Sequence, residues 1–162
     1  MVNRKIITVS DLKSCLPRLR QTSTLVLATG CFDVLHQAHI DFLKAAKNKG
    51  DLLIVGLEKD QRVTALKGKN RPINNWQKRV DSLAKLKMVD FVFSLPNTFS
   101  NSKDHLKLLK LIKPDIFAVS QNTPNLEKKQ KLVEKIKAKL FIFPFNQKYS
   151  TTSLLTKQVD SD

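Results

Sequence analysis

The feature that most constrains the fold is an alternation of short apolar runs with longer amphipathic stretches. The runs have the length and the β-branched or aromatic content of buried strands. They lie at residues 24–29, 52–57, 91–93, 116–119 and 140–143. The stretches between them repeat apolar residues at helical spacing, as at Leu106, Leu109 and Ile112. Strands that alternate with helices predict an α/β fold with a mostly parallel five-stranded sheet flanked by helices.

Capping residues and breakers place the helices along the chain. A leading helix is expected within residues 1–22, with Ser10 as its cap and with Pro17 ending or kinking it. Further helices are predicted at residues 38–49, 76–87, 100–112, 126–137 and 150–157. Asn75 is the expected cap of the one at 76–87. Residues 58–72 are polar and basic, and no regular element is assigned to them.

One junction between a strand and a helix carries the strongest chemical signal. Residues 30–39 read Gly-Cys-Phe-Asp-Val-Leu-His-Gln-Ala-His and contain two of the three histidines of the chain. A spacing of three places His36 and His39 on one face of a helical turn. Ligands of parallel sheets bind at this kind of junction, and a glycine turn with imidazoles beside a helix N-terminus suits a phosphate group. Asp33 is placed to orient a side chain or to help hold Mg²⁺.

The same ten residues resemble the G-x-F-D-x-x-H-x-G-H signature of the cytidylyltransferase-like nucleotidyltransferases. The similarity continues through Lys67-Gly68, Arg71-Pro72-Ile73-Asn74 and Tyr149-Ser150-Thr151-Thr152. Those strings are most similar to the heptose 1-phosphate adenylyltransferase domain. The resemblance implies one Rossmann-like domain over residues 1–162, and the tail at 158–162 is expected to fray.

The resemblance also implies a reaction. An NMP unit would move from an NTP, preferably ATP, to a phosphorylated sugar such as heptose 1-phosphate, with release of pyrophosphate. His36, His39 and Lys67 would be catalytic. The histidines would donate hydrogen bonds to the α-phosphate, while Lys67 and an Mg²⁺ ion bound to the NTP would steady the leaving pyrophosphate. Arg71 would bind the phosphate of the acceptor.

The nucleotide site implied by the resemblance is larger than the catalytic group. Its expected members are Thr29, Gly30, Cys31, Phe32, Asp33, His36, His39, Lys67, Arg79, Asn122, Ser150, Thr151 and Thr152. Ser150 to Thr152 also read as the N-cap of a helix, and the same helix end can serve both roles. No protein group is expected to bind the metal directly, with Asp33 as the one candidate.

Two departures from the family pattern leave the specificity open. Ala38 stands where the signature has glycine, and its methyl group fits without strain if the local φ is negative. Residues 120–123 read Ser-Gln-Asn-Thr in place of a G-G-D-Y-like string, so Asn122 supplies a polar group without a charge. The alternatives are CTP-dependent transfer to glycerol 3-phosphate or a similar alcohol phosphate, and a catalytically weak nucleotide-binding homologue.

Charge and composition bear on partners and location. The formal net charge of +15 attracts phosphates, but the lysines follow helical faces without interleaved aromatic residues, so no nucleic-acid partner is expected. No apolar run reaches the roughly 20 residues that span a bilayer. Cys15 and Cys31 fit a reducing compartment, and a cytoplasmic location is expected. Relatives often form homodimers. His105, on a lysine-rich helix, is predicted to be a surface residue.

Overall fold

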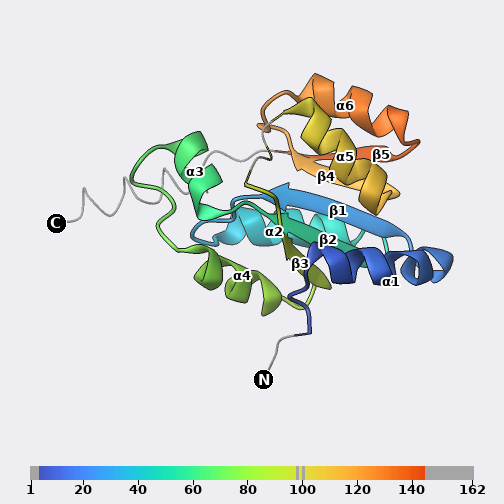
Figure 1. Cartoon of the computed structure of the whole chain (residues 1–162), viewed down its shortest axis with the longest axis horizontal. Helices are drawn as coiled ribbons and strands as arrows, with labels where there is room; N and C mark the ends of the chain where they lie inside the picture. Colours follow the sequence, from blue (N-terminus) through green and yellow to red (C-terminus); the bar gives the residue numbers. More distant parts are fainter. Residues whose placement is uncertain (1–3, 98, 100, 145–162) are drawn as a thin grey trace.

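The computed structural model describes residues 4–97, 99 and 101–144 as a parallel sheet between two layers of helices (Figure 1). The five strands run in the order β3-β2-β1-β4-β5, and every neighbouring pair is parallel. Their bounds are β1 Leu25–Gly30, β2 Leu52–Leu57, β3 Phe91–Ser94, β4 Ile116–Ser120 and β5 Lys139–Phe143. The predicted α/β fold is confirmed, and the sheet is parallel throughout.

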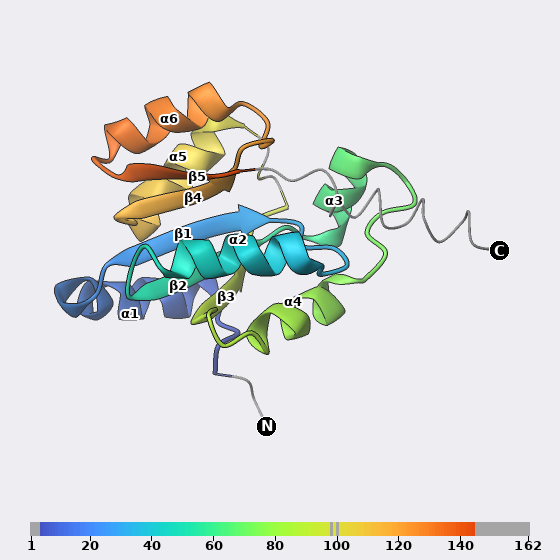
Figure 2. The same cartoon turned by 180° about the vertical axis from the view of Figure 1, so that it is seen from behind.

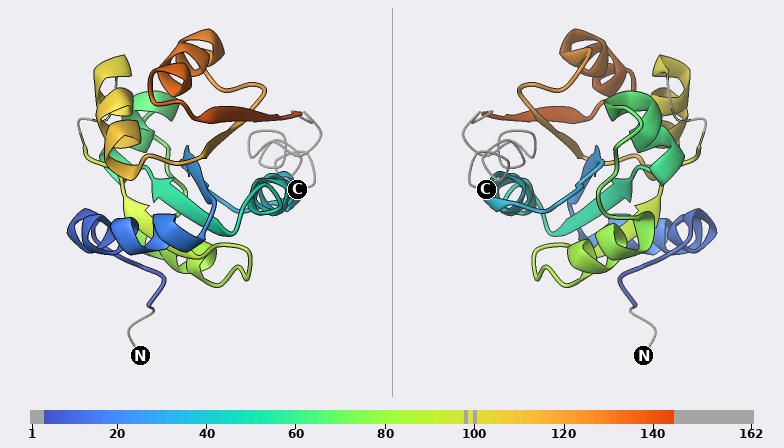
Figure 3. Two further views of the ribbon diagram at one scale, coloured as in Figure 1. Left: turned by 90° about the vertical axis from the view of Figure 1, so that its right-hand side faces the viewer. Right: turned by 90° about the vertical axis from the view of Figure 1, so that its left-hand side faces the viewer.

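The helices follow the order α1 Val9–Thr22, α2 Gln37–Lys47, α3 Asp60–Lys67, α4 Trp76–Ala84, α5 Ser102–Ile112 and α6 Leu126–Lys135. Helices α2 and α4 cover one face of the sheet, while α1, α5 and α6 cover the other (Figures 1 and 2). Helix α3 lies beyond the carboxyl ends of the strands, as the end-on view in Figure 3 shows. The expected helix at 150–157 and the tail at 158–162 lie outside the described residues.

The core is divided by the sheet into two apolar layers. In β1, Leu25 and Leu27 pack with α1, α5 and α6, whereas Val26 and Ala28 pack with α2 and α4. All four side chains are fully buried. A central parallel strand is covered on both faces, which explains why its sequence is continuously apolar rather than alternating.

The leading helix corrects two expectations. Thr8, not Ser10, caps α1: its hydroxyl accepts from the Asp11 amide at 3.1 Å, and the Asp11 carboxylate accepts in return from the Thr8 amide. Pro17 lies inside α1, which continues to Thr22. A proline removes one backbone donor, but burial of the apolar face of α1 against the sheet stabilises the helix across that gap.

Helix α3 occupies part of the segment to which no element was assigned. Val63 is its one buried residue, so the sequence has almost no apolar periodicity there. Gly68 follows with a φ of 100°, a left-handed value that terminates the helix at Lys67. Helix α3 forms because tertiary contacts hold it at the carboxyl edge of the sheet, and local propensity gives no strong signal for it.

Candidate active site

The candidate site lies where the order of the strands reverses. The chain runs outward from β1 through β2 to β3, then returns to β4 on the other side of β1. Loops leaving adjacent strands in opposite directions open a crevice at such a point. A cavity of about 550 Å³ occupies this position, between the end of β1, α3, the start of α5 and the segment that leads into α6. Thr29, Gly30, Cys31 and Lys67, all predicted at the nucleotide, line it.

The two signature histidines form a stacked pair at the start of α2. Their ring centroids are 3.8 Å apart with an interplanar angle of 22°, and the ring of His39 also meets the edge of Phe32. His36 is the N-cap residue of α2, and its side chain makes no capping hydrogen bond. In each ring the Nδ1 atom is buried without a hydrogen-bond partner among the described residues. The structure therefore brings both imidazoles and the uncapped helix N-terminus to one place.

Both imidazoles are neutral at physiological pH. Burial lowers the pKa of His39 to about 3, and the nearby His36 and the Lys67 cation act in the same direction. Burial, followed by the Lys67 charge, also lowers the pKa of His36. A neutral imidazole carries one N–H donor and one acceptor nitrogen. An anion bound here would stabilise the charged form and raise both pKa values.

Lys67 connects the histidine pair with the cavity. It is the last residue of α3, it is exposed, and it lines the cavity while its charge acts on both imidazoles. Its ammonium group has no ion-pair partner in the described part of the chain. Lys67 thus offers a free positive charge at the place where the sequence predicts the leaving group.

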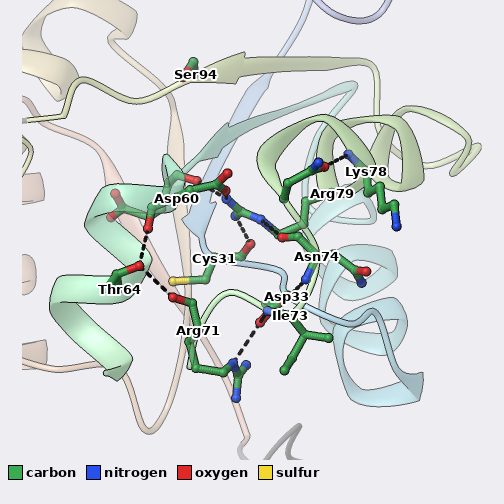
Figure 4. Close-up of polar contacts among 12 residues, drawn as sticks. Cys31, Asp33, Asp60, Thr64, Arg71, Ile73, Asn74, Lys78, Arg79 and Ser94 are labelled. Atoms are coloured by element: carbon green, nitrogen blue, oxygen red, sulfur yellow. Dashed lines mark hydrogen bonds and ion pairs between the residues drawn. The ribbon is translucent and has the colours of Figure 1, made fainter. Parts of the chain in front are cut away.

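Asp33 holds the segment that follows α3 in place. Its side chain is buried and accepts from Arg71 Nε, from the Ile73 amide and from the Asn74 amide at 2.8 to 2.9 Å (Figure 4). Burial alone would raise its pKa, but these bonds hold the pKa of Asp33 below its ordinary value. Its oxygens are thereby committed to the protein. Within residues 4–97, 99 and 101–144, no group of three or more His, Cys, Asp or Glu side chains is arranged to hold a metal ion.

The guanidinium of Arg71 is only partly used by this contact. Its Nε pairs with Asp33, whereas its Nη2 is buried without a hydrogen-bond partner among the residues described. The Arg71 carbonyl accepts from the Thr64 hydroxyl at 2.6 Å, which ties the segment to α3. The predicted role of Arg71 as a phosphate-binding group therefore stays a prediction that this geometry can accommodate.

Arg79 has a different position from the one expected. Its side chain has no exposed surface and donates to the carbonyl oxygens of Asn74, Cys31 and Glu58 and to the Asp60 carboxylate (Figure 4). These bonds join the loops after β1 and β2 to the segment before α4. In this arrangement Arg79 supports the site from beneath, and its guanidinium is not presented to a phosphate. The sequence could not reveal this because an arginine reads as a surface residue until its partners are known.

The remaining predicted residues have mixed placements. Phe32 is buried with a φ of 44°, and it packs beneath His39 instead of lining the cavity. Asn122 is exposed after β4, and its side chain accepts from the Ser120 hydroxyl at 2.7 Å. Ala38 lies in the first turn of α2 and has no positive φ, so its methyl group brings no backbone strain. Ser150, Thr151 and Thr152 lie outside the described residues.

Two titratable cavity residues were missed or misjudged. Glu58 follows β2 directly, and burial raises its pKa to about 7. His105 was predicted at the surface, but it is half-buried and lines the cavity, and its ring centroid lies 4.1 Å from that of Phe99 in a tilted arrangement. The position of Glu58 at the carboxyl end of a strand was a usable signal. No sequence signal distinguishes His105 from a surface histidine, because its environment comes from the packing of α5 against α6.

Comparison with known proteins identifies the family of the chain. Residues 27–158 match the cytidylyltransferase-like family. The chain is 37% identical over 155 residues to the bifunctional protein HldE of Helicobacter hepaticus, covering 95% of this chain and 30% of that protein. It is 44% identical over 113 residues to HldE of Campylobacter fetus, covering 70% of this chain and 23% of that protein. The chain therefore spans less than a third of the length of these relatives.

Two solved structures share the fold. The lipopolysaccharide core biosynthesis protein from Thermoplasma volcanium is 30% identical with a TM-score of 0.60, covering 76% of this chain and 97% of that one. A pantoate-β-alanine ligase from Francisella tularensis is 21% identical with a TM-score of 0.69 over 88% of this chain and 67% of that one, which shows likeness of fold alone. From the family match and the HldE relatives we conclude that the chain belongs to the cytidylyltransferase-like family and is a nucleotidyltransferase.

Proposed function

We propose that the chain transfers AMP from ATP to a sugar 1-phosphate, with heptose 1-phosphate as the preferred acceptor, and releases pyrophosphate. The observation that carries the proposal is the neutral, stacked pair His36 and His39 at the uncapped N-terminus of α2, with Lys67 beside it. Neutral donors, backbone amides and the Lys67 cation would form a phosphate-binding group at the reversal point of the sheet. The choice of acceptor is supported by similarity to HldE.

The chemistry requires positioning more than covalent assistance. An oxygen of the acceptor phosphate attacks the α-phosphorus in line, and the bond from that phosphorus to the bridging oxygen of the β-phosphate breaks. Negative charge grows on the α-phosphate and on the leaving oxygen. The imidazole N–H groups and the first amides of α2 would donate to those oxygens, and a well-aimed donor of this kind is worth about 2.7–4 kcal/mol in the transition state.

The residues at the site also bear on the metal. The family generally uses an NTP with a divalent ion, which supplies charge neutralisation on the β- and γ-phosphates. Asp33 is fully engaged by Arg71 and by two amides, so it does not fit the role of a ligand. Mg²⁺ therefore enters as a companion of the nucleotide, and Lys67 would hold the phosphates that carry it. Lysine suits this task because its charge sits on a long, mobile stem.

The rest of the site divides between the two substrates. Thr29, Gly30 and Cys31 were predicted at the nucleotide, but we assign the cavity that they line to the acceptor. Arg71 would approach the acceptor phosphate with its Nη2, which has no partner among the described residues. Asn122 and the segment Ser150 to Thr152 remain candidates for the nucleotide. The partners of the reaction are two small molecules, and a homodimer in the cytoplasm remains an expectation. The helices that the structure describes include none long and apolar enough to cross a membrane.

The direct test measures pyrophosphate release with ATP or CTP as donor and with heptose 1-phosphate or glycerol 3-phosphate as acceptor. The proposal predicts turnover with ATP and heptose 1-phosphate and little with the other pairs. Preference for CTP and glycerol 3-phosphate would establish the alternative specificity. Nucleotide binding without turnover on any pair, with activity restored by Ala38→Gly, would establish a catalytically weak homologue.

A further inference from the structure

A buried acid on the wall of the cavity has no role in the reaction described so far. Glu58 is 8% exposed and lines the cavity that also receives Lys67. Its backbone is fixed on both sides: its amide donates to the Gly30 carbonyl at 3.0 Å, and its carbonyl accepts from Arg79 Nη2 at 2.9 Å. Because the backbone is fixed by neighbouring strands and by a buried arginine, the carboxylate belongs to a preorganised wall.

The carboxylate lacks the partners that a buried acid normally has. Its Oε2 atom is buried without a hydrogen-bond partner among the described residues. Burial raises the pKa of Glu58 to about 7 even though Arg62, Arg79 and Lys129 attract its charge. The Arg79 guanidinium donates elsewhere, to three carbonyl oxygens and Asp60, and the Lys129 ammonium donates to the Thr123 hydroxyl.

A complementary donor lies on the same cavity. The Nε atom of Arg62 is also buried without a hydrogen-bond partner in the part of the chain that the structure describes, and Arg62 lines the cavity with Glu58. The two side chains form no ion pair with each other there. An unused acceptor and an unused donor therefore belong to two residues that line the same cavity. A hydroxyl group fits such a pair because it can donate one hydrogen bond and accept others.

From this arrangement we propose that Glu58 binds hydroxyl groups of the phosphorylated acceptor and makes the cavity selective for polyhydroxylated substrates. The assignment rests on the proposed function, in which Arg71 approaches the acceptor phosphate and the body of the acceptor fills the cavity. Hydroxyl groups donate to the Glu58 carboxylate and accept from Arg62 Nε. A phosphate beside the ionised Glu58 would meet it as a like charge, whereas a hydroxyl group donates to it. A buried polar group left unpaired is what rejects an analogue that lacks the hydroxyl.

The test compares two probes that share a phosphate and differ in hydroxyl groups. Calorimetry would measure the affinities of heptose 1-phosphate and ethyl phosphate for the full chain with α,β-methylene-ATP and Mg²⁺ present. The proteins would be the wild type, Glu58→Gln, Glu58→Leu and the matched control Glu134→Gln, whose carboxylate is exposed on α6. We expect the wild type and the control to prefer heptose 1-phosphate by about tenfold or more, as for hydrogen bonds to a charged group. In both Glu58 variants the preference should fall to about threefold or less, with unchanged affinity for the ATP analogue.

Each other outcome overturns one specific claim. A preference that survives in Glu58→Gln, the variant closest in shape to the wild type, would remove Glu58 from acceptor recognition. Weaker binding of the ATP analogue in the Glu58 variants would place the carboxylate at the nucleotide and equally overturn the assignment. If the wild type binds heptose 1-phosphate but releases no pyrophosphate when ATP replaces the analogue, the proposed function would be contradicted while the role of Glu58 is left intact. Failure to bind either probe would contradict both.

Discussion

The imidazole rings of His36 and His39 stack with their centroids 3.8 Å apart, and each ring leaves a buried Nδ1 atom without a protein partner among the described residues. Two cations could not occupy this arrangement, because burial and mutual repulsion both disfavour charge. The pair is therefore a neutral hydrogen-bonding group that an anion converts toward the charged form. This property underlies the first two predictions.

The titration of the histidines provides the first prediction. In the free protein His39 should stay neutral down to about pH 3, and adding ATP with Mg²⁺ should raise the pKa of both rings. Nitrogen-15 NMR of the ring nitrogens measures both values. An ordinary pKa near 6.5 for His39 in the free protein would contradict the buried, stacked geometry.

The same pair determines part of the acid stability. The pKa of His39 is lower in the folded chain, so between pH 6.5 and about 3 the unfolded chain binds a proton at His39 and the folded chain does not. Stability is then complete above the unfolded value of 6.5 and is lost as the pH falls toward about 3. His39→Gln should flatten this dependence in urea unfolding curves recorded between pH 7 and pH 4. A slope identical to that of the wild type would show that the ring is not buried neutral.

Removing either imidazole should affect the rate more than the binding of substrates. His36→Ala and His39→Ala should each lower kcat by about 10²–10³-fold, the cost of removing one donor that acts on developing charge. KM for ATP should change much less, because the donors act mainly in the transition state. Steady-state pyrophosphate release measures both constants. Turnover unaffected by His36→Ala would contradict the assigned role.

Replacement of Arg79 should lower the free energy of unfolding, because its side chain supports the fold and is not expected to act directly in the reaction. Arg79→Leu leaves the carbonyl oxygens of Asn74, Cys31 and Glu58 without their donor, and the buried ones cost about 1–3 kcal/mol each. Urea unfolding should show a loss of about 3 kcal/mol or more. Full stability together with weak ATP binding would instead support direct contact between Arg79 and a phosphate. Lys78→Leu, an exposed neighbour on the same helix, is the control.

Glu58 should make the protein less stable as the pH rises through neutrality. Its folded pKa is raised to about 7, so the folded chain holds a proton that the unfolded chain loses above its own value near 4.5. Stability from this group is complete below pH 4.5 and is lost as the pH rises to about 7. Glu58→Gln should therefore gain stability relative to the wild type from pH 5 to pH 8, and Glu134→Gln should not. Thermal melts at both pH values distinguish the two outcomes.

Most of the fold could be predicted from the sequence, because buried parallel strands are continuous apolar runs and the helices between them repeat apolar residues at helical spacing. The apolar runs at Leu25 to Ala28 and Leu52 to Leu57 could only be strands once helical stretches separated them, and Asn75 caps α4 as predicted. Helix α3 was not predicted, because Val63 is its one buried residue and an apolar repeat is therefore missing from its sequence. Its position depends on contacts with more distant segments, such as the bond from Arg79 to Asp60 at the start of α3, that no local pattern encodes.

The site divides in the same way between local and distant information. His36 and His39 could be placed because the spacing and the junction are both local, and Lys67 followed from family resemblance. The contacts of Arg79 could not be predicted because its four partners come from segments as far as 48 positions along the chain. Asp33 was predicted to orient a side chain or to help hold Mg²⁺, and its bond to Arg71 is of the first kind. The partners of such charged residues can be identified only from the three-dimensional structure.

The most direct test of the central claim follows the oxygen atoms of the acceptor phosphate. Heptose 1-phosphate labelled with ¹⁸O in its three non-bridging oxygens is incubated with ATP, Mg²⁺ and the enzyme, and mass spectrometry measures the label in both products. Attack by the acceptor phosphate on the α-phosphorus predicts ADP-heptose that retains all of the label and pyrophosphate that contains none. Label in the pyrophosphate, or no ADP-heptose at all, would contradict the account.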